Sequence, residues 1–409
     1  MLTFDGILCF IATNNWTTNA GASILRNKVI NDTQILSLID FGSYMVFEDS
    51  ASIQTMIMLF KKETKADNYS FDYRKLNKQN ASRQEAMALL TKSQKEALYL
   101  TPRINRDNLR NSLLTFSSDD KEAILDKIAE NAAFLDSKDA TNGIHPHYDF
   151  VSNKIARKYP FTKVGDGIFA LSKSEKDNLH LSEAEEKLIK PYYTGEDIHR
   201  YYTSRQNKFW IIYTSSDFKN PHSMDAYPHL KAHLDFYKDV ITSDNKPYGL
   251  HRAREERFFK GEKIVCQRMC VGRPSFSYSN FNAYVSATFY VINTSRFNLK
   301  YLTGLLNSKL VFFWLYNRGK MKGDNFQVDK EPLMQIPIKT NNLYEPSVIK
   351  YVSSILTKMS SDLDADISLE EKYIDLLVFH IYDLSYDEVL VVDPQTPISR
   401  EEYDKVDTI

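Results

Sequence analysis

Short apolar runs of strand length open the chain. Three of them predict buried strands, at residues 6–13 (GILCFIAT), 35–41 (ILSLIDF) and 53–60 (IQTMIMLF). Residues 20–30 lie between the first two runs and predict a helix with Leu25, Val29 and Ile30 on one side. The order strand, helix, strand, strand is typical of the closing edge of an α/β sheet, and it is too small to be a domain by itself.

The middle of the chain changes character twice. Residues 66–140 are polar with apolar positions at helical spacing, which predicts a helical linker or insert. Turn-forming residues at 141–147 (TNGIHPH) then mark a domain boundary. From 141 to 340 short strand patterns alternate with loops and helices, and the aromatic and β-branched runs 209–214 and 284–293 predict two of the strands.

Helices are predicted at several further places in the chain. Residues 298–316 predict one amphipathic helix, and residues 341–409 predict an acidic, helical C-terminal region. Two capping boxes are predicted, at Ser182 with Glu185 and at Ser368 with Glu371. The helix after the second box is expected to turn five residues toward the core: Tyr373, Leu376, Leu377, His380 and Ile381.

The composition is that of an ordinary globular protein. The 409 residues are 43% hydrophobic and 26% charged, which suits two or three domains with a sizeable core. The longest apolar run, residues 310–316, is far shorter than the roughly 20 residues that cross a bilayer. With only three cysteines, the sequence favours a reducing compartment, and we expect a cytoplasmic protein without a membrane segment.

The net charge of −1 hides an uneven distribution. Residues 241–340 hold 16 Lys and Arg against 7 Asp and Glu, a net charge of +9, whereas residues 341–409 hold 5 against 15, a net charge of −10. A local positive field can attract an anionic partner even when the total charge is near zero. The two segments can equally neutralise one another within the fold.

Motifs that bind cofactors or metals are missing from the sequence. The closest glycine pair, Gly165 and Gly167, lacks the strand-to-helix setting of a dinucleotide or S-adenosylmethionine loop and predicts a plain turn. Cys266 and Cys270 have no second ligand pair, and the pair of histidines in 145–147 (HPH) predicts a loop rather than a metal site. The sequence therefore predicts no catalytic, cofactor-binding or metal-binding residue.

Basic residues interleaved with aromatic and amide side chains are the most informative feature. Arg and Lys neutralise phosphates, and Arg, Asn and Gln pair with base edges. Nine residues are therefore predicted to contact DNA: Arg252, Arg254, Arg257, Arg268, Arg318, Lys320, Lys322, Asn325 and Gln327. For the first three, an alternative is pairing with Glu255, Glu256 and Glu262 on a solvated helix. Asp324 is the only acidic residue close in sequence to Arg318, Lys320 and Lys322, which favours nucleic-acid contact there.

Several long segments resemble a known enzyme family. GILCFIATNNW, LRNKVI, LIDFG and IQTMIMLF resemble the part of adenine-N6 DNA methyltransferases that follows their catalytic motif. LIKPYYTGEDIHRYY, HRAREERFFKGEKIVCQR, YLTGLLNSKLVFFWL and GKMKGDNFQVDKEPLMQIPI resemble the target-recognition domain of type IIG restriction–modification enzymes and Taq-type methyltransferases. YIDLLVFHIYDLSYDEV resembles their C-terminal helix. The resemblance covers nearly the whole chain and is weakest over residues 66–140.

The resemblance implies an α/β fold class with four parts. They are the last strands of a Rossmann-like methyltransferase sheet (1–65), a helical insert (66–140), an α+β target-recognition domain (141–340) and an acidic helical region (341–409). A sheet of this kind without its first strands would expose an unpaired apolar edge. Asn14, Asn15 and Trp16 fall where the family has the edge of its base pocket, although a strand-end turn with a packed Trp explains them equally well.

The family's catalytic groups are not found in this sequence. There an Asn/Asp-Pro-Pro-Tyr/Phe motif positions the flipped adenine, and a glycine-rich strand end holds S-adenosylmethionine; neither motif occurs here. We therefore expect this chain to bind no cofactor and to be inactive alone, with S-adenosylmethionine, and magnesium if the parent enzyme also cleaves DNA, belonging to the complete enzyme.

Four interpretations remain open at this point. The favoured one is recognition of double-stranded DNA as the specificity portion of an adenine methyltransferase or type IIG enzyme, with an N-terminal methyltransferase half as partner. A stand-alone module like a specificity subunit, or an inactive remnant of an interrupted gene, is the alternative. A small metal-dependent hydrolase is disfavoured because the sequence shows no convincing cluster of metal-binding carboxylates.

Overall fold

Two compact units make up the structure, a computed structural model. It describes residues 3–47, 53–63, 68–78, 80–106, 114–322 and 325–406. Unit 1 comprises Met1–Glu130 and Trp314–Asn325, and unit 2 comprises Asn131–Phe313 and Phe326–Ile409. The chain therefore leaves unit 2 within one helix, α9 (Lys309–Arg318), and returns to it within one short strand, β19 (Asn325–Gln327). None of the described helices is long and apolar enough to cross a membrane.

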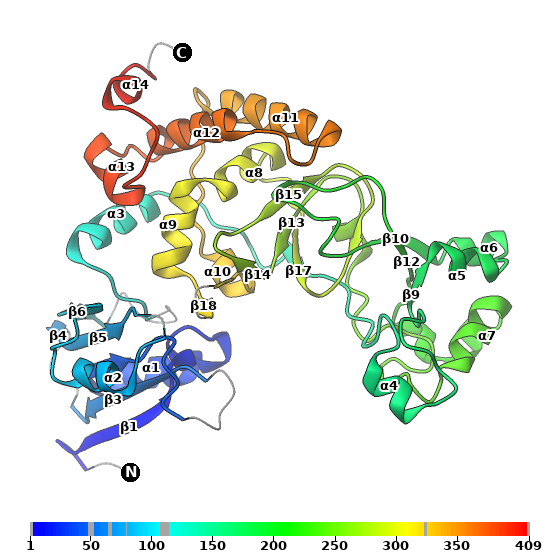
Figure 1. Cartoon of the computed structure of the whole chain (residues 1–409), viewed down its shortest axis with the longest axis horizontal. Coiled ribbons are helices and arrows are strands. Elements are labelled where there is room, and N and C mark those ends of the chain that lie inside the picture. Colours follow the sequence, from blue (N-terminus) through cyan, green and yellow to red (C-terminus); the bar gives the residue numbers. More distant parts are fainter. Residues whose placement is uncertain are drawn as a thin grey trace. The chain divides into compact units, whose positions relative to one another are not determined.

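A five-stranded sheet forms the centre of unit 1 (Figure 1). Its strands in spatial order are β1 (Ile7–Thr13), β3 (Thr55–Lys61), β2 (Gln34–Asp40), β5 (Asp72–Leu76) and β6 (Ala97–Leu100). β3 is antiparallel to both β1 and β2, whereas β2 and β5 are parallel. The three strands that the sequence predicts are thus confirmed, and they end a mixed α/β sheet as expected.

Unit 1 also contains several smaller elements. They are η1 (Asn14–Thr17), η2 (Ala20–Ala22), α1 (Ser23–Asp32), β4 (Asn68–Ser70), α2 (Arg83–Leu90), β7 (Arg103–Asn105), α3 (Asp119–Ala129) and β18 (Met321–Lys322). Val29 and Ile30 of α1 are buried, but Leu25 is 50% exposed, so the prediction for Leu25 is wrong. The side chain that α1 buries in its place is Arg26, which donates to the backbone oxygen of Trp16 at 3.0 Å.

The segment 66–140 differs from the predicted helical insert. It contains α2 and α3, but β5 and β6 within it extend the sheet of unit 1. Tyr73 and Leu76 of β5 are buried in the apolar core of unit 1. Short strands of five residues carry too few positions to separate a period of 2 from one of 3.6.

Two sheets form the body of unit 2. The four-stranded sheet has the order β16 (Tyr284–Val285), β10 (Ile189–Tyr193), β12 (Phe209–Ile212) and β9 (Ala170–Ser172). The five-stranded sheet has the order β11 (Tyr201–Tyr202), β15 (Phe276–Ser279), β13 (Lys263–Gln267), β17 (Phe289–Ile292) and β8 (Ala140–Asn142). The predicted strand at 209–214 is confirmed as β12.

Helices and short turns surround these sheets. The α-helices in the first part of unit 2 are α4 (Asn153–Lys158), α5 (Lys173–Asn178), α6 (Glu183–Glu186), α7 (Pro228–Phe236) and α8 (Leu299–Asn307). The short 3-10 helices in the same part are η3 (Ser216–Lys219), η4 (Pro221–Met224) and η5 (Glu256–Phe259). The later helices are α10 (Lys330–Met334), α11 (Glu345–Ser361), α12 (Ser368–Ile381), α13 (Tyr386–Val392) and α14 (Arg400–Asp404). A short strand, β14 (Met269–Val271), follows β13.

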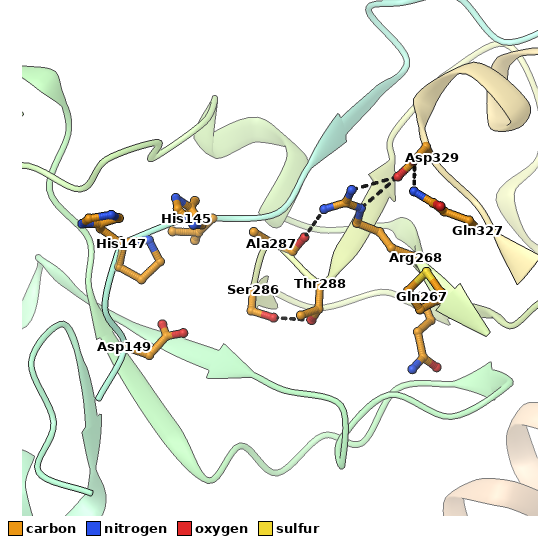
Figure 2. Close-up of a pocket in the computed structure, with 13 residues that line it drawn as sticks. His145, His147, Asp149, Gln267, Arg268, Ser286, Ala287, Thr288, Gln327 and Asp329 are labelled. Carbon is orange, nitrogen blue, oxygen red and sulfur yellow. Dashed lines mark hydrogen bonds and ion pairs between the residues drawn. The ribbon is translucent and has the colours of Figure 1, made fainter. Parts of the chain in front are cut away.

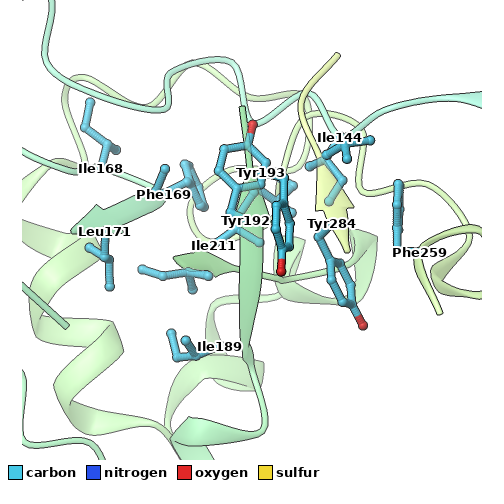
Figure 3. Close-up of a cluster of buried hydrophobic side chains, with 14 of the residues drawn as sticks. Ile144, Ile168, Phe169, Leu171, Ile189, Tyr192, Tyr193, Ile211, Phe259 and Tyr284 are labelled. Carbon is cyan, nitrogen blue, oxygen red and sulfur yellow. The ribbon is translucent and has the colours of Figure 1, made fainter. Parts of the chain in front are cut away.

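A large apolar cluster lies around the four-stranded sheet (Figure 3). Ile189 and Tyr192 of β10 and Ile211 of β12 are buried in it. Phe259 stacks on Tyr284 with ring centroids 5.3 Å apart. Burial of this many large side chains stabilises the frame that holds the neighbouring loops in place.

Two predicted elements are divided in the structure. The predicted strand 284–293 is interrupted at residues 286–288, and its halves, β16 and β17, belong to different sheets. The predicted helix 298–316 breaks at Ser308, because the side chain of Asn307 binds both backbone groups of Phe276, at 3.1 and 2.7 Å. Both breaks depend on partners distant in sequence, which no local pattern reveals.

One of the two capping boxes forms. Ser182 and Glu185 exchange the predicted hydrogen bonds at the start of α6. The prediction at Ser368 is wrong, because Ile367 is the N-cap of α12 and Glu371 pairs with Arg200 and Arg273. α12 does bury Leu376, Leu377 and Ile381 as predicted, and Tyr373 and His380 are half-buried.

Candidate nucleic-acid interface

A cavity of about 580 Å³ lies in unit 2, and most of the residues that line it have polar side chains (Figure 2). Four segments far apart in sequence line it: 144–149, 267–269, 286–288, and residues 327 and 329. Residues 286–288 are the turn that divides β16 from β17, so the interruption of the predicted strand builds one wall of the cavity.

Arg268 ties three of these segments together. Its backbone nitrogen donates to the oxygen of Thr288 at 3.0 Å, and its backbone oxygen accepts from Val328 at 2.8 Å. Its guanidinium group donates to Asp329 from Nη2 at 2.8 Å and from Nε at 3.2 Å, and to the oxygen of Ala287 at 3.2 Å. The side chain stays 36% exposed, so the guanidinium group is held in place at the surface of the cavity.

Two glutamines flank Arg268. Gln327 donates from Nε2 to Asp329 at 2.5 Å, which leaves Gln327 Oε1 to accept. Gln267 is exposed at the end of β13, and within the described part of the chain no group forms a hydrogen bond with its side-chain amide. Figure 2 shows Arg268, Gln327 and Asp329 meeting at one end of the cavity. Of the nine predicted DNA-contacting residues, Arg268 and Gln327 are thus brought to one site.

Arg252 and Arg254 lie on the loop beside the other end of the cavity. Arg252 forms two backbone hydrogen bonds with His145, at 3.0 and 2.9 Å, and its side chain pairs with Asp244 at 3.2 Å. Arg254 donates from Nε to the oxygen of Gly143 at 3.4 Å. The carboxylate beside Arg252 is therefore Asp244 and not one of the three glutamates that the sequence suggests.

Arg257 and Arg318 pair with acidic residues. Arg257 donates to Glu255 at 2.9 Å and to the backbone oxygen of Lys138 at 2.8 Å. For Arg257 the structure therefore agrees with the alternative interpretation, an ion pair with a neighbouring glutamate. Arg318 forms an ion pair with Glu122 of α3, whose Oε1 lies 3.2 Å from Nη1. The sequence suggests only Asp324 as a counter-charge for Arg318, because Glu122 is 196 residues away.

The other predicted loop residues lie in unit 1. Lys320 and Asn325 are half-buried. Asp324 and the side chain of Lys322 lie outside the described residues. Their contact with DNA stays a prediction.

Trp16 is a core residue of unit 1. It is 6% exposed, its Nε1 donates to the sulfur of Met56 at 3.2 Å, and its ring packs edge-on against Phe60. Asn14 donates to Asp40 at 3.2 Å, and Asn15 is exposed. The position of Trp16 agrees with the alternative interpretation, a strand-end turn with a packed Trp.

Unit 2 offers no glycine loop for a nucleotide at Gly165 and Gly167. Gly165 has φ +92°, typical of a turn, and the nitrogen of Gly167 already donates to Glu175 at 2.7 Å. No group of three His, Cys, Asp or Glu residues in the described ranges could hold a metal ion. Burial raises the pKa of Cys270 to about 11, which disfavours the thiolate form that binds metals.

The sequence does not predict several residues of the cavity. Gln267 and Asp329 have no predicted role, although both lie close to predicted contacts, and residues 286–288 belong to a predicted strand. His145 and His147 belong to a loop with no predicted function, and they line the end of the cavity opposite Asp329 (Figure 2). Their proximity to Arg268 depends on the tertiary fold alone.

Two family models match the chain. Residues 190–338 match the TaqI-like C-terminal specificity domain, and residues 1–47 match the Eco57I restriction-modification methylase. The resemblance to restriction–modification enzymes is confirmed. The first match includes β10, β13 and most of the cavity, and the second includes β1, α1 and β2.

A solved structure of a restriction–modification enzyme has a similar fold. The type IIL enzyme MmeI, solved in complex with DNA, aligns over 98% of this chain and 50% of its own, with a TM-score of 0.56 and 13% sequence identity. The type IIG restriction endonuclease BpuSI aligns over 93% and 48%, with a TM-score of 0.34 and 12% identity. The chain spans about half the length of MmeI, and the likeness concerns the fold. No curated protein matches the chain in sequence.

Proposed function

We propose that this chain recognises a short sequence in double-stranded DNA as the specificity portion of an adenine-N6 DNA methyltransferase in a restriction–modification system. One observation carries the proposal: Gln267, Arg268 and Gln327 line one cavity within the region that matches the TaqI-like specificity domain. Glutamine and arginine are the side chains that pair best with the edges of adenine and guanine.

Each of the three side chains has donors or acceptors left for a base. The amide of Gln267 can donate to N7 and accept from N6 of adenine. The hydrogen bonds of Arg268 to Asp329 and Ala287 occupy three of its five N–H groups, and the rest can reach O6 or N7 of guanine. Gln327 keeps its oxygen as an acceptor for an exocyclic amine. Phosphate contacts from Arg252 and Arg254 would set the position of the duplex without reading its sequence.

Methyl transfer is assigned to groups outside this chain. The residues here do not fit S-adenosylmethionine, because the nitrogen of Gly167 is occupied by Glu175 and the sequence has no Asn-Pro-Pro-Tyr motif. We place a methyltransferase half beside β1, because residues 1–47 match a methylase model and, among the described residues, β1 pairs only with β3. A stand-alone recognition module remains the second candidate.

The test is selection of duplexes with randomised positions by the purified chain, followed by sequencing. We expect the wild type to enrich one motif, and Gln267→Ala and Arg268→Ala each to relax the preference at one base pair. The expected loss is about 1–3 kcal/mol of discrimination at that position. Gln395→Ala and Arg400→Ala, which change exposed residues near the C-terminus, are the matched controls. The proposal fails if the wild type enriches no motif, or if the motif is the same in both cavity variants.

A further inference from the structure

Three histidines gather at the end of the cavity opposite Arg268. We call His145, His147 and His251 the histidine cluster. Their ring centroids lie 5.2 Å (His145 to His251), 5.6 Å (His147 to His251) and 6.0 Å (His145 to His147) apart. Three of the nine histidines of the chain thus lie side by side, with ring centroids no more than 6.0 Å apart. Figure 2 shows His145 and His147 on the segment that forms this end of the cavity.

Backbone hydrogen bonds fix the cluster. His145 and Arg252 form an isolated antiparallel bridge, which brings the segment of His145 and His147 beside the loop of His251. Gly143 anchors the first segment from behind, because its nitrogen donates to the oxygen of Phe289 at 2.9 Å. The proximity of the three rings is therefore built into the fold.

The groups that face the cluster are mostly cationic or neutral. Arg252 and Arg254 lie on the same loop as His251. The hydroxyl of Thr242 contacts Nδ1 of His147, and the ring of Tyr148 packs on the ring of His147. Two carboxylates are near. Asp244 lies 3.5 Å from His251 Nδ1 but is shared with Arg252 at 3.2 Å, and Asp149 accepts from the hydroxyl of Tyr192 at 2.9 Å. Across the cavity, the charge of Arg268 is paired with Asp329.

This arrangement opposes protonation of His145. Burial lowers the pKa of His145, and the neighbouring histidines and the two arginines lower it further. An anion placed among the rings would reverse the balance, because a negative charge favours the protonated imidazole. Binding an anion would then be coupled to proton uptake.

We propose that the histidine cluster binds a phosphodiester of DNA beside the base-reading cavity and takes up protons when it does so. The inference rests on the proposed function for the identity of the ligand. DNA fits because His145 and His147 of the cluster line the same cavity as Gln267 and Arg268, and His251 packs against both of these histidines. Inorganic phosphate shares the same chemistry and is separated from DNA by the test.

The experiment measures affinity for the selected duplex from pH 8 to pH 6 at constant ionic strength. Backbone phosphodiesters do not titrate in this range, so a pH dependence belongs to the protein. We expect affinity to rise toward pH 6, on the order of tenfold for each pH unit over which about one proton is taken up. Calorimetry in buffers of different ionisation enthalpy measures the same proton uptake directly.

A triple variant, His145→Gln, His147→Gln and His251→Gln, should lose this rise, so that it differs most from the wild type at pH 6. His222→Gln, at an exposed histidine paired with Asp225, is the matched control and should keep the wild-type profile. If the triple variant does not fold, His147→Gln alone replaces it, because His147 is exposed. A flat profile in the wild type, or the same slope in wild type and variant, overturns the proposal.

Inorganic phosphate is titrated separately at constant ionic strength. Histidine NMR shifts that saturate with phosphate, together with a flat profile for DNA, would assign the cluster to free phosphate and overturn the DNA contact. Loss of motif selection at pH 8 in the wild type would instead refute the proposed function. The two failures are therefore distinguishable.

Discussion

Asp329 is the residue that positions the two side chains at the centre of the cavity. Its carboxylate accepts from Arg268 and from Gln327, at 2.8 and 2.5 Å. A hydrogen bond to a charged partner is short and directional, so both side chains lose freedom before any ligand arrives. At this scale, recognition depends on a residue that need not contact a base.

Replacing Asp329 by Ala should lower specificity more than affinity. The guanidinium group of Arg268 would gain freedom and lose its counter-charge, whereas Gln327 would lose its orientation. We expect the ratio of affinities for the selected and a scrambled duplex to fall about tenfold, since a bidentate base contact supplies about 1–3 kcal/mol of discrimination. Competition binding measures the ratio. Asp387→Ala, which removes the exposed partner of Arg400, is the control, and an unchanged ratio in Asp329→Ala would contradict the assigned role.

Glu185 is a fully buried carboxylate with an unusual number of donors. It accepts from the backbone nitrogen of His229 at 2.7 Å, from the ring of His229 at 2.9 Å and from Ser182. Burial by itself would raise its pKa, but these hydrogen bonds outweigh burial and lower the pKa of Glu185 to about 2. In the unfolded chain the same carboxyl titrates near pH 4.3.

Stability should therefore depend on Glu185 in a defined pH window. Because the folded pKa is lowered, its contribution is present above about pH 4.3 and is lost as the pH falls toward 2. We expect Glu185→Gln to lower the free energy of unfolding by about 1–3 kcal/mol at pH 7, since a neutral amide cannot satisfy the same donors. Urea unfolding at pH 7, 4 and 3 should show the difference shrinking. The control is Glu186→Gln, at an exposed ion pair, and an equal loss at each pH would contradict the prediction.

At the scale of elements, the cavity exists because two segments approach each other without a side chain between them. A Cβ atom on Gly143 would lie 2.0 Å from the backbone oxygen of Ser286 and 2.7 Å from that of Val285. The segment of Gly143 leads into the histidine cluster, and Ser286 begins the turn that lines the adjoining wall. This contact therefore sets the distance between two walls of the cavity.

Gly143→Ala should separate those two segments. We expect a loss of about 1–3 kcal/mol in stability, as for overpacking in a filled core, because the clashing atoms belong to the backbone. DNA affinity should fall as well. Thermal unfolding and duplex binding test this against Gly195→Ala in the same unit, where the added Cβ would meet nothing within 4 Å. A fully stable Gly143→Ala variant would refute the packing argument.

At the scale of the whole molecule, unit 1 carries an open sheet edge. In the described ranges β1 pairs with β3 alone, and Ile7 and Phe10 on it are 58% and 55% exposed. An apolar edge strand is an unusual surface for an isolated protein and invites pairing with another strand. The sequence match of residues 1–47 to a methylase model makes a methyltransferase segment the proposed occupant.

The chain by itself should not bind S-adenosylmethionine. The glycine-rich strand end and the Asn-Pro-Pro-Tyr motif are absent from the sequence, and Gly167 is engaged by Glu175. Calorimetric titration should therefore give only heats of dilution, with binding of the selected duplex as proof that the protein is folded. A stoichiometric site of micromolar affinity would place the cofactor on this chain and overturn the division of labour that we propose.

The sequence by itself determined the features that depend on neighbouring residues. The apolar runs of β1, β2 and β3, the capping box of Ser182 with Glu185 and the absence of catalytic motifs are all local. The resemblance to restriction–modification enzymes also follows from contiguous motifs, and the family matches confirm it. Local periodicity and capping chemistry act within about four residues, so they can be read directly from the chain.

Only the tertiary structure decided which cations and polar groups work together. Arg318 forms an ion pair with Glu122, which is 196 residues away in sequence. The predicted strand 284–293 is divided, and its middle residues line the cavity. The tertiary structure also joined Arg268 to Asp329 and gathered the three histidines from two loops. Charge pairing and cavity walls depend on distances in space, and residues that are far apart in sequence acquire those distances only when the sheets have formed.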